Sequence, residues 1–176
     1  MAVLDILVYP DPRLKKSAQR VEKVEDPIRG FIADLEETRR ASPGCVGIAA
    51  PQVGCFLQIV IVDVSGKPHI PNHGHLVLIN PKILSREGEV VGREGCLSVP
   101  DYTGNVARAE SITLTAWDEC GDRQVYSMTG FEARAVQHEI DHLRGLLFLD
   151  RLASRRNSLF RRKVYKKPAL PATNRS

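Results

Sequence analysis

The chain has 176 residues, 43% of them hydrophobic, and this length suits one domain with a single core. The N-terminal stretch has an acid at Asp5 and no basic leader, so it does not resemble a secretory signal. No apolar run approaches the roughly 20 residues that a membrane helix needs. We therefore expect a cytoplasmic protein that does not associate with membranes. The four cysteines form no CxxC pair, which favours reduced thiols.

Charge is distributed unevenly along the chain. Residues 151–176 carry nine Lys and Arg and no acid, whereas residues 1–150 carry 16 basic and 21 acidic residues, a net charge of −5. We therefore expect a single domain over residues 1–150 and a basic tail over residues 151–176. Such a tail is either a solvated terminus or a contact for nucleic acid, and the charge pattern favours neither alternative.

The first predicted elements are a helix and two strands. A helix begins at Asp26-Pro27, a cap followed by a first-turn proline, and ends near residues 42–44. Its apolar face has the i, i+3, i+4, i+7 spacing, with Ile28, Phe31, Ile32 and Leu35. Residues 56–64 and 76–80 are aliphatic runs bounded by Gly, Pro and Asn, as strands are.

The loop between these two strands contains three histidines. His69, His73 and His75 surround Pro71 and Gly74, and their spacing fits no single face of a helix or strand. We therefore expect an exposed polar loop rather than a second metal site.

The last predicted elements are a hairpin and a helix. Residues 111–117 alternate polar with apolar side chains, and a turn leads to a return strand over residues 123–128. Thr129 and Glu132 have the spacing of a capping box, and the helix that follows continues to Arg144, where Gly145 offers a C-terminal stop. Because strands precede a late helix, the order predicts an α+β fold, with antiparallel β-sheets wrapped around that central helix.

An HExxH sequence lies well inside this late helix. His138 and His142 are four residues apart, so both imidazoles lie on one helix face and can reach the same metal ion. Glu139 is placed to touch a metal-bound water. Two solvated histidines are the alternative, but the register of cap, helix and motif favours the metal site.

The third ligand must come from another part of the chain. No HExxHxxGxxH continuation follows, which argues against the metzincin pattern. Cys96 is the leading candidate because a glycine beside it permits close backbone approach, although a lone cysteine is more often a small buried hydrophobe. We expect Glu94 to orient the loop that carries Cys96.

Three segments together resemble the signature motifs of the peptide deformylase family. They are EGCLS at residues 94–98, QHEIDHLRG at 137–145, and CVGIAAPQ at 45–52, which matches the family's GxGxAAxQ except at Cys45. The likeness covers about residues 4–152. Two positions depart from the pattern. Cys45 replaces a glycine, and its side chain either narrows the groove or points into the core; we expect the core. Thr103 stands where some members have an arginine, seven residues after Cys96.

The resemblance implies a role for each matching residue. The implied metal ligands are Cys96, His138 and His142. The implied catalytic groups are Glu139 as acid and base, with Gln52 and the Leu97 backbone N–H as donors to the developing oxyanion. The implied walls of the peptide groove are Val46, Gly47 and Gly95. For the apolar pocket of the substrate's side chain, we expect Ile48, Val136 and His138.

The resemblance also implies an activity, a cofactor and partners. The activity is metal-dependent removal of the formyl group from formyl-methionine at the N-terminus of new polypeptides, with release of formate. Ferrous iron is the implied native ion, and zinc, nickel or cobalt are alternatives that the same ligands accept. The resemblance also implies an enzyme that works on chains as they emerge from the ribosome. We expect a monomer in the bacterial cytoplasm, with the basic tail as a candidate contact for the ribosome.

Two other kinds of protein share parts of this pattern. A structural metal-binding module would add a fourth protein ligand to Cys96, His138 and His142, whereas a catalytic site leaves that position open for water. An HExxH peptidase would share the metal chemistry but would cut an internal amide. A nucleic-acid-binding protein is disfavoured, because the acidic body lacks a recognisable binding motif.

Overall fold

The structure is a computed structural model that describes residues 2–162. Its two α-helices within this range are α1 (Asp26–Arg40) and α2 (Gly130–Leu143). A five-stranded antiparallel sheet has the order β1-β2-β3-β6-β7, and a three-stranded antiparallel sheet has the order β4-β5-β8. The strands are β1 (Gly47–Ala49), β2 (Ile59–Val62), β3 (Leu76–Glu87), β4 (Val90–Cys96), β5 (Val99–Arg108), β6 (Ser111–Trp117), β7 (Arg123–Thr129) and β8 (Leu159–Arg161).

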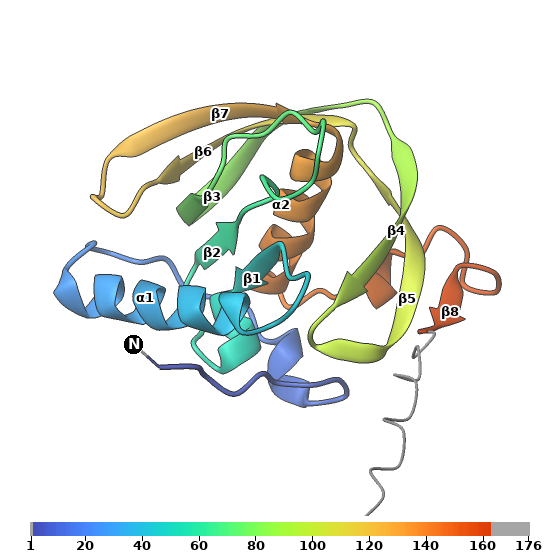
Figure 1. The fold of residues 1–176 in the computed structure, drawn as a ribbon, viewed down its shortest axis with the longest axis horizontal. Helices are drawn as coiled ribbons and strands as arrows, with labels where there is room; N and C mark the ends of the chain where they lie inside the picture. Colours follow the sequence, from blue (N-terminus) through green and yellow to red (C-terminus); the bar gives the residue numbers. More distant parts are fainter. Residues whose placement is uncertain (1, 163–176) are drawn as a thin grey trace, which may run out of the picture.

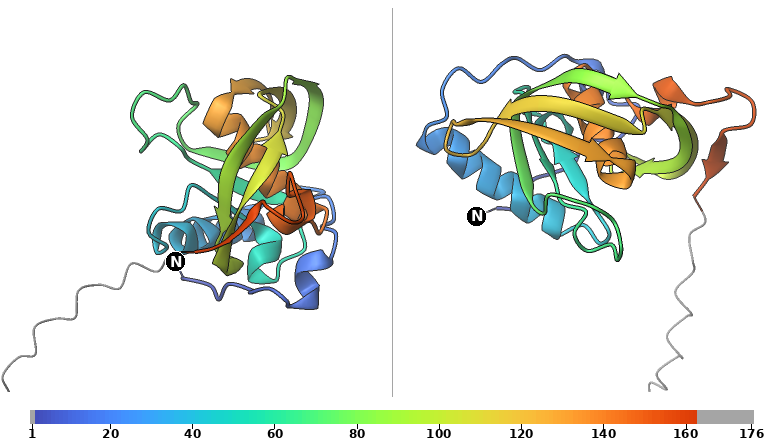
Figure 2. Two further views of the ribbon diagram at one scale, coloured as in Figure 1. Left: turned by 90° about the vertical axis from the view of Figure 1, so that its right-hand side faces the viewer. Right: turned by 90° about the horizontal axis from the view of Figure 1, so that it is seen from above.

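Helix α2 lies at the centre, with the five-stranded sheet curving over one side of it and the three-stranded sheet over another (Figures 1 and 2). This arrangement confirms the predicted α+β fold, with antiparallel sheets around the late helix. The predicted first helix, hairpin and strands are all present, although β3 extends seven residues beyond the predicted strand end at residue 80.

The five-stranded sheet has a helix against each face, and the side chains of β2 show why. Val60 and Val62 belong to the apolar cluster that includes α2, whereas Ile59 and Ile61 belong to the cluster that includes α1. Successive residues of a strand point to opposite faces, so a strand covered on both sides is apolar throughout. This accounts for the unbroken aliphatic run IVIV in the sequence.

The two ends of α2 are formed differently from each other. Gly145 has a φ of +74° and ends the helix as predicted, and a side chain there would collide with the backbone of Lys15. The predicted capping box is wrong. Thr129 is the N-cap, but its side chain makes no capping hydrogen bond. The carboxylate of Glu132 instead accepts hydrogen bonds from the backbone N–H and the ring Nδ1 of His73, at 2.7 and 2.6 Å.

The predicted boundary at residue 150 differs from the structure. Arg151 donates to the Asp141 carboxylate of α2, and β8 pairs with β5, joining Thr103 to Phe160 in register. Ser158 between them is buried. Residues 151–162 are therefore part of the folded domain. The rest of the predicted basic tail, residues 163–176, lies outside the described residues.

The structure also gives the state of the cysteines and the length of its helices. All four cysteines are free, as predicted. Among residues 2–162, no helix has the length and hydropathy needed to cross a membrane.

Candidate active site

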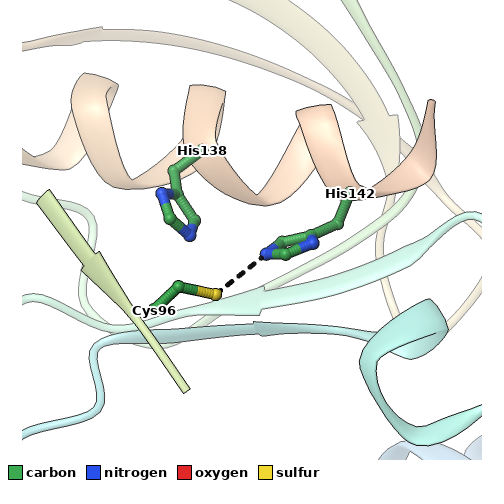
Figure 3. Close-up of side chains that lie close together, drawn as sticks. All are labelled: Cys96, His138 and His142. Carbon is green, nitrogen blue, oxygen red and sulfur yellow. Dashed lines mark hydrogen bonds between the residues drawn. The ribbon is translucent and has the colours of Figure 1, made fainter. Parts of the chain in front are cut away.

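Three potential metal ligands converge beneath α2. Cys96 is the last residue of β4, and His138 and His142 project from adjacent turns of α2 toward its thiol (Figure 3). Their ligand atoms all lie within 4.8 Å of one another, and Cys96 Sγ is 3.4 Å from His142 Nε2. All three residues are buried.

This geometry fits a metal ion. Bond lengths of about 2.3 Å to sulfur and 2.0–2.1 Å to nitrogen place tetrahedral ligand atoms about 3.4–3.6 Å apart. His138 Nδ1 donates to Glu94 Oε1 at 2.8 Å, so Nε2 is left with its lone pair toward the site. Within residues 2–162, the potential metal-binding group consists of Cys96, His138 and His142. A tetrahedral ion held by these three residues keeps its fourth position open for water or substrate.

Glu139 lies beside these three residues but is not one of the potential metal ligands. Its Oε1 is 3.9 Å from His138 Nε2, and its buried Oε2 has no hydrogen-bond partner among the described residues. Burial raises the pKa of Glu139 to about 7. Gly47 permits this placement, because a Cβ on residue 47 would lie 2.9 Å from Glu139 Cγ and Oε1. The site therefore holds a carboxyl group ready to exchange a proton near neutral pH.

The two predicted oxyanion donors lie at the same site. Gln52 is almost fully buried, and its Oε1 accepts a hydrogen bond from the Ala49 N–H at 2.9 Å. This bond turns the Gln52 amide NH₂ toward Cys96 Sγ, at 3.5 Å, and Ser98 Oγ, at 3.1 Å. Leu97 follows Cys96 at the turn between β4 and β5 and lines the adjoining cavity.

A cavity of about 280 Å³ opens onto Cys96 and His138. The predicted groove residues Val46, Gly47 and Gly95 line it together with His138. The α2 residues that reach the cavity are Phe131, Arg134, Ala135, His138 and Glu139.

Ile48 and Val136 are not among the lining residues, contrary to the sequence-based expectation for the side-chain pocket. Both are fully buried in the apolar clusters on the two faces of the five-stranded sheet. Ile48 follows Gly47 on β1 and therefore points to the opposite face of the strand. Val136 is one residue beyond Ala135, which rotates it by about 100° around the helix axis and away from the cavity.

Cys45 also differs from its expected position. Its side chain does not enter the core but is half-buried at the cavity wall, where Sγ donates to the Gly47 carbonyl at 3.0 Å. Burial raises the pKa of this thiol to about 12, so Cys45 stays protonated at neutral pH.

Glu94 connects the site to a buried charge network. Besides His138, its carboxylate accepts hydrogen bonds from Arg108 at 2.8 and 2.9 Å and from Arg134 at 2.7 Å. Arg108 reaches onward to Asp141 on α2. Burial alone would raise the pKa of Glu94, but the hydrogen bonds from Arg108 and His138 outweigh it and hold the pKa well below the usual range. Glu94 therefore fixes the ring of His138, one of the three potential metal ligands.

Arg108, Arg134 and Asp141 are the residues that the sequence-based analysis missed. Their charge was the only signal that the sequence offered. A fully buried charged residue almost always has a partner, but the sequence alone does not show which charged residues are buried. Arg108 and Asp141 are about 5% exposed.

The histidine loop forms no second metal site within the described residues. His73 contacts Glu132, and His75 Nε2 lies 3.0 Å from Glu36 on α1. Two of the three histidines therefore tie the β2–β3 loop to the two helices.

Known proteins resemble this chain in both sequence and fold. The family model described as polypeptide deformylase matches residues 3–158. A peptide deformylase of Alkalilimnicola ehrlichii is 46% identical over 94% of this chain and 91% of its own length. One from Syntrophobacter fumaroxidans is 42% identical over 95% of this chain and 96% of its own length.

Solved structures agree with these relatives. The peptide deformylase of Ehrlichia chaffeensis in complex with actinonin superposes with a TM-score of 0.82 at 38% identity, covering 89% of this chain and 92% of that one. The Legionella pneumophila peptide deformylase gives 0.80 at 39% identity, with 88% of each chain covered. With sequence, fold and the Cys96, His138 and His142 site in agreement, the chain belongs to the polypeptide deformylase family.

Proposed function

We propose that the cavity beside α2 is the deformylase active site and that Cys96, His138 and His142 hold its metal ion. The family's reaction is metal-dependent removal of the formyl group from N-terminal formyl-methionine. The observation that carries the assignment is the convergence of three ligand atoms within 4.8 Å next to the unpartnered carboxylate oxygen of Glu139. When bound, the ion supplies a Lewis acid and lowers the pKa of a coordinated water.

Glu139 is the proposed acid and base. Its carboxylate takes a proton from the attacking water and then delivers that proton to the departing amine, so one group serves both steps. A pKa near 7 suits a group that must accept and return a proton at neutral pH. The products are formate and a free N-terminal methionine.

Gln52 and the Leu97 N–H are the proposed donors to the oxyanion. The bond from the Ala49 N–H to Gln52 Oε1 fixes the amide plane, so the NH₂ group already lies beside Cys96 when charge develops on the former formyl oxygen. Preorganised donors of this kind lower the barrier, and losing one costs about 2.7–4 kcal/mol.

The backbone of Val46-Gly47 on one side of the cavity and Gly95 on the other is the proposed docking site for an extended peptide. A solved structure of the Acinetobacter baumannii peptide deformylase, whose fold matches with a TM-score of 0.79, has Met-Ala-Ser bound. The methionine side chain would contact the apolar part of the cavity wall, which includes Val46, Leu97, Phe131 and Ala135.

Formate release tests the proposed function. Purified protein reconstituted with ferrous iron under anaerobic conditions should release formate from a formyl-Met peptide and leave its internal amides intact. Reconstitution with zinc, nickel or cobalt tests the metal, because thiolate and imidazole accept all four ions. We propose ferrous iron as the native ion. Cleavage of an internal amide without formate release would indicate a peptidase instead.

We further propose that the protein acts as a monomer in the cytoplasm and contacts the ribosome through its basic C-terminal residues. Residues 163–176 add Lys163, Lys166 and Lys167 to the exposed Arg155 and Arg156, and such cations bind phosphate with a strong dependence on salt. Deletion of residues 163–176 leaves β8 in place and should weaken co-sedimentation with ribosomes at low salt. Unchanged co-sedimentation would exclude residues 163–176 as the docking element.

A further inference from the structure

The outer part of the active-site cavity carries excess positive charge. Four cations line it: Lys67, Arg93, Arg134 and Arg162. The lining carboxylates are Glu94 and Glu139. Glu94 is already bonded to Arg134, Arg108 and His138. Within residues 2–162, Lys67, Arg93 and Arg162 form no ion pair.

Arg162 reaches the cavity because the chain leading to it is anchored to the second sheet. The Ser158 carbonyl accepts a hydrogen bond from the Asn105 N–H at 2.8 Å, and β8 then pairs with β5. The Phe160 ring lies under the Arg93 guanidinium, 3.8 Å from its centroid. The Arg162 N–H donates to the Asp101 carbonyl at 2.7 Å. These contacts fix the backbone up to and including residue 162.

The Arg162 guanidinium lies against Gly95, the residue that precedes the metal ligand Cys96. A Cβ built on Gly95 would be 2.7 Å from Arg162 Nη2 and 3.5 Å from Thr103 Cγ2. The absence of a side chain at residue 95 therefore makes room for the guanidinium. It also places this charge beside the backbone that we propose to pair with the peptide, immediately downstream of the formyl-methionine.

Two of the other cations that line the cavity, Arg93 and Lys67, already contact other side chains. Arg93 donates to Asn105 and Thr103 and stacks on Phe160. Lys67 lies over the Phe131 ring, 4.7 Å from its centroid. The Arg162 side chain has no hydrogen-bond acceptor among the described residues, so it is the cation best placed to bind a ligand.

We propose that Arg162 is a specificity-determining residue that binds a carboxylate of the peptide just downstream of formyl-methionine. A guanidinium binds a carboxylate through two parallel hydrogen bonds, which distinguishes it from the neutral amide of the same shape. The carboxylate is either an acidic side chain or the C-terminus of a short peptide. This inference rests on the proposed function, since it concerns the same cavity and reaction.

The test compares kcat and KM for matched formyl-Met tripeptides. One pair carries Glu or Gln in the third position with an amidated C-terminus. The second pair carries Ala there, with a free or an amidated C-terminus. Wild type should show a lower KM for the carboxylate member of at least one pair, by about twofold to fivefold, as expected for an exposed ion pair. The pair that shows the difference identifies the source of the carboxylate.

Three variants decide whether Arg162 causes the preference. Arg162→Gln should abolish it chiefly through KM, and Arg162→Lys should restore part of it and make it more sensitive to salt. Arg161→Gln removes the same charge from the neighbouring β8 residue, which does not line the cavity, and should leave the preference intact. No preference in wild type, or an equal preference in Arg162→Gln, would overturn the inference while formate release persists. Absence of formate release from every peptide would overturn the proposed function with it.

Discussion

The two sheets hold α2 by different means. The five-stranded sheet meets it with apolar side chains, such as Val60 and Leu114 against Val136 and Ile140. The three-stranded sheet meets it with charges, through Glu94 and Arg108 on strands β4 and β5. Apolar burial is non-directional and scales with area, whereas a buried charge network depends on the position of each atom. The apolar side of α2 therefore contributes stability, whereas the charged side contributes stability and also orients the proposed catalytic groups.

The largest expected effect is on turnover, at the side of α2 that faces the metal site. Glu139→Gln should retain metal but lower kcat by about 10²- to 10⁴-fold, because the amide cannot accept the proton. Cys96→Ala should lose the metal itself, since a ligand is removed. Metal analysis alongside formate release separates the two variants. Near-normal turnover in metal-loaded Glu139→Gln would show that this carboxyl group is not the acid and base.

Glu94→Gln should affect both stability and metal binding. The substitution leaves Arg108 buried beside a neutral group, which costs about 3–5 kcal/mol of unfolding free energy. It also weakens the hydrogen bond that orients His138, which lowers metal affinity by about 10- to 100-fold. Chemical denaturation and metal-competition titration measure the two effects. A stable variant with normal metal affinity would remove the distinction between the two sheets.

A core substitution on the apolar side provides the matched contrast. Leu114 is fully buried on β6, so Leu114→Ala should lower the unfolding free energy by about 2–5 kcal/mol. Metal affinity and kcat at a temperature where the protein is folded should stay close to wild type. If this variant lost metal as Glu94→Gln does, the two sides of α2 would be coupled rather than separate.

The smallest expected effect is a pH-dependent change in stability at Glu36, which lies away from the active site. Burial raises the pKa of Glu36, but hydrogen bonds from Arg39, His75 and Arg40 outweigh it and lower the pKa to about 2. Because the folded-state pKa is depressed, this stabilisation is present above about pH 4.5 and is lost as the pH falls toward 2.

Glu36→Gln should therefore cost about 1 kcal/mol at pH 7 and make little difference near pH 2. Denaturation curves of both proteins at several pH values provide the measurement. A constant difference across this range would contradict the assignment. Metal affinity should not change, since Glu36 contacts the β2–β3 loop and not the site.

Local patterns in the sequence determined the helix that carries the chemistry. The HExxH spacing and the stop at Gly145 predict α2 and the two histidines on one of its faces, because these signals act within a few residues. The 111–128 hairpin is local in the same way. Strands β4 and β5 were not predicted, since their sequences contain Gly, Pro and charged residues that weaken the strand pattern.

The partners of the charged groups were decided only by the tertiary structure. Glu94 lies 44 residues from His138 and 14 from Arg108, and Glu132 lies 59 from His73. No local period relates residues at such separations, so Glu132 was assigned to a capping box that it does not form. Arg162 was assigned to a tail for the same reason, because only the pairing of β8 with β5 brings it to Gly95. The sequence therefore identified the proposed metal ligands, and the packing of the two sheets around α2 determined what orients them.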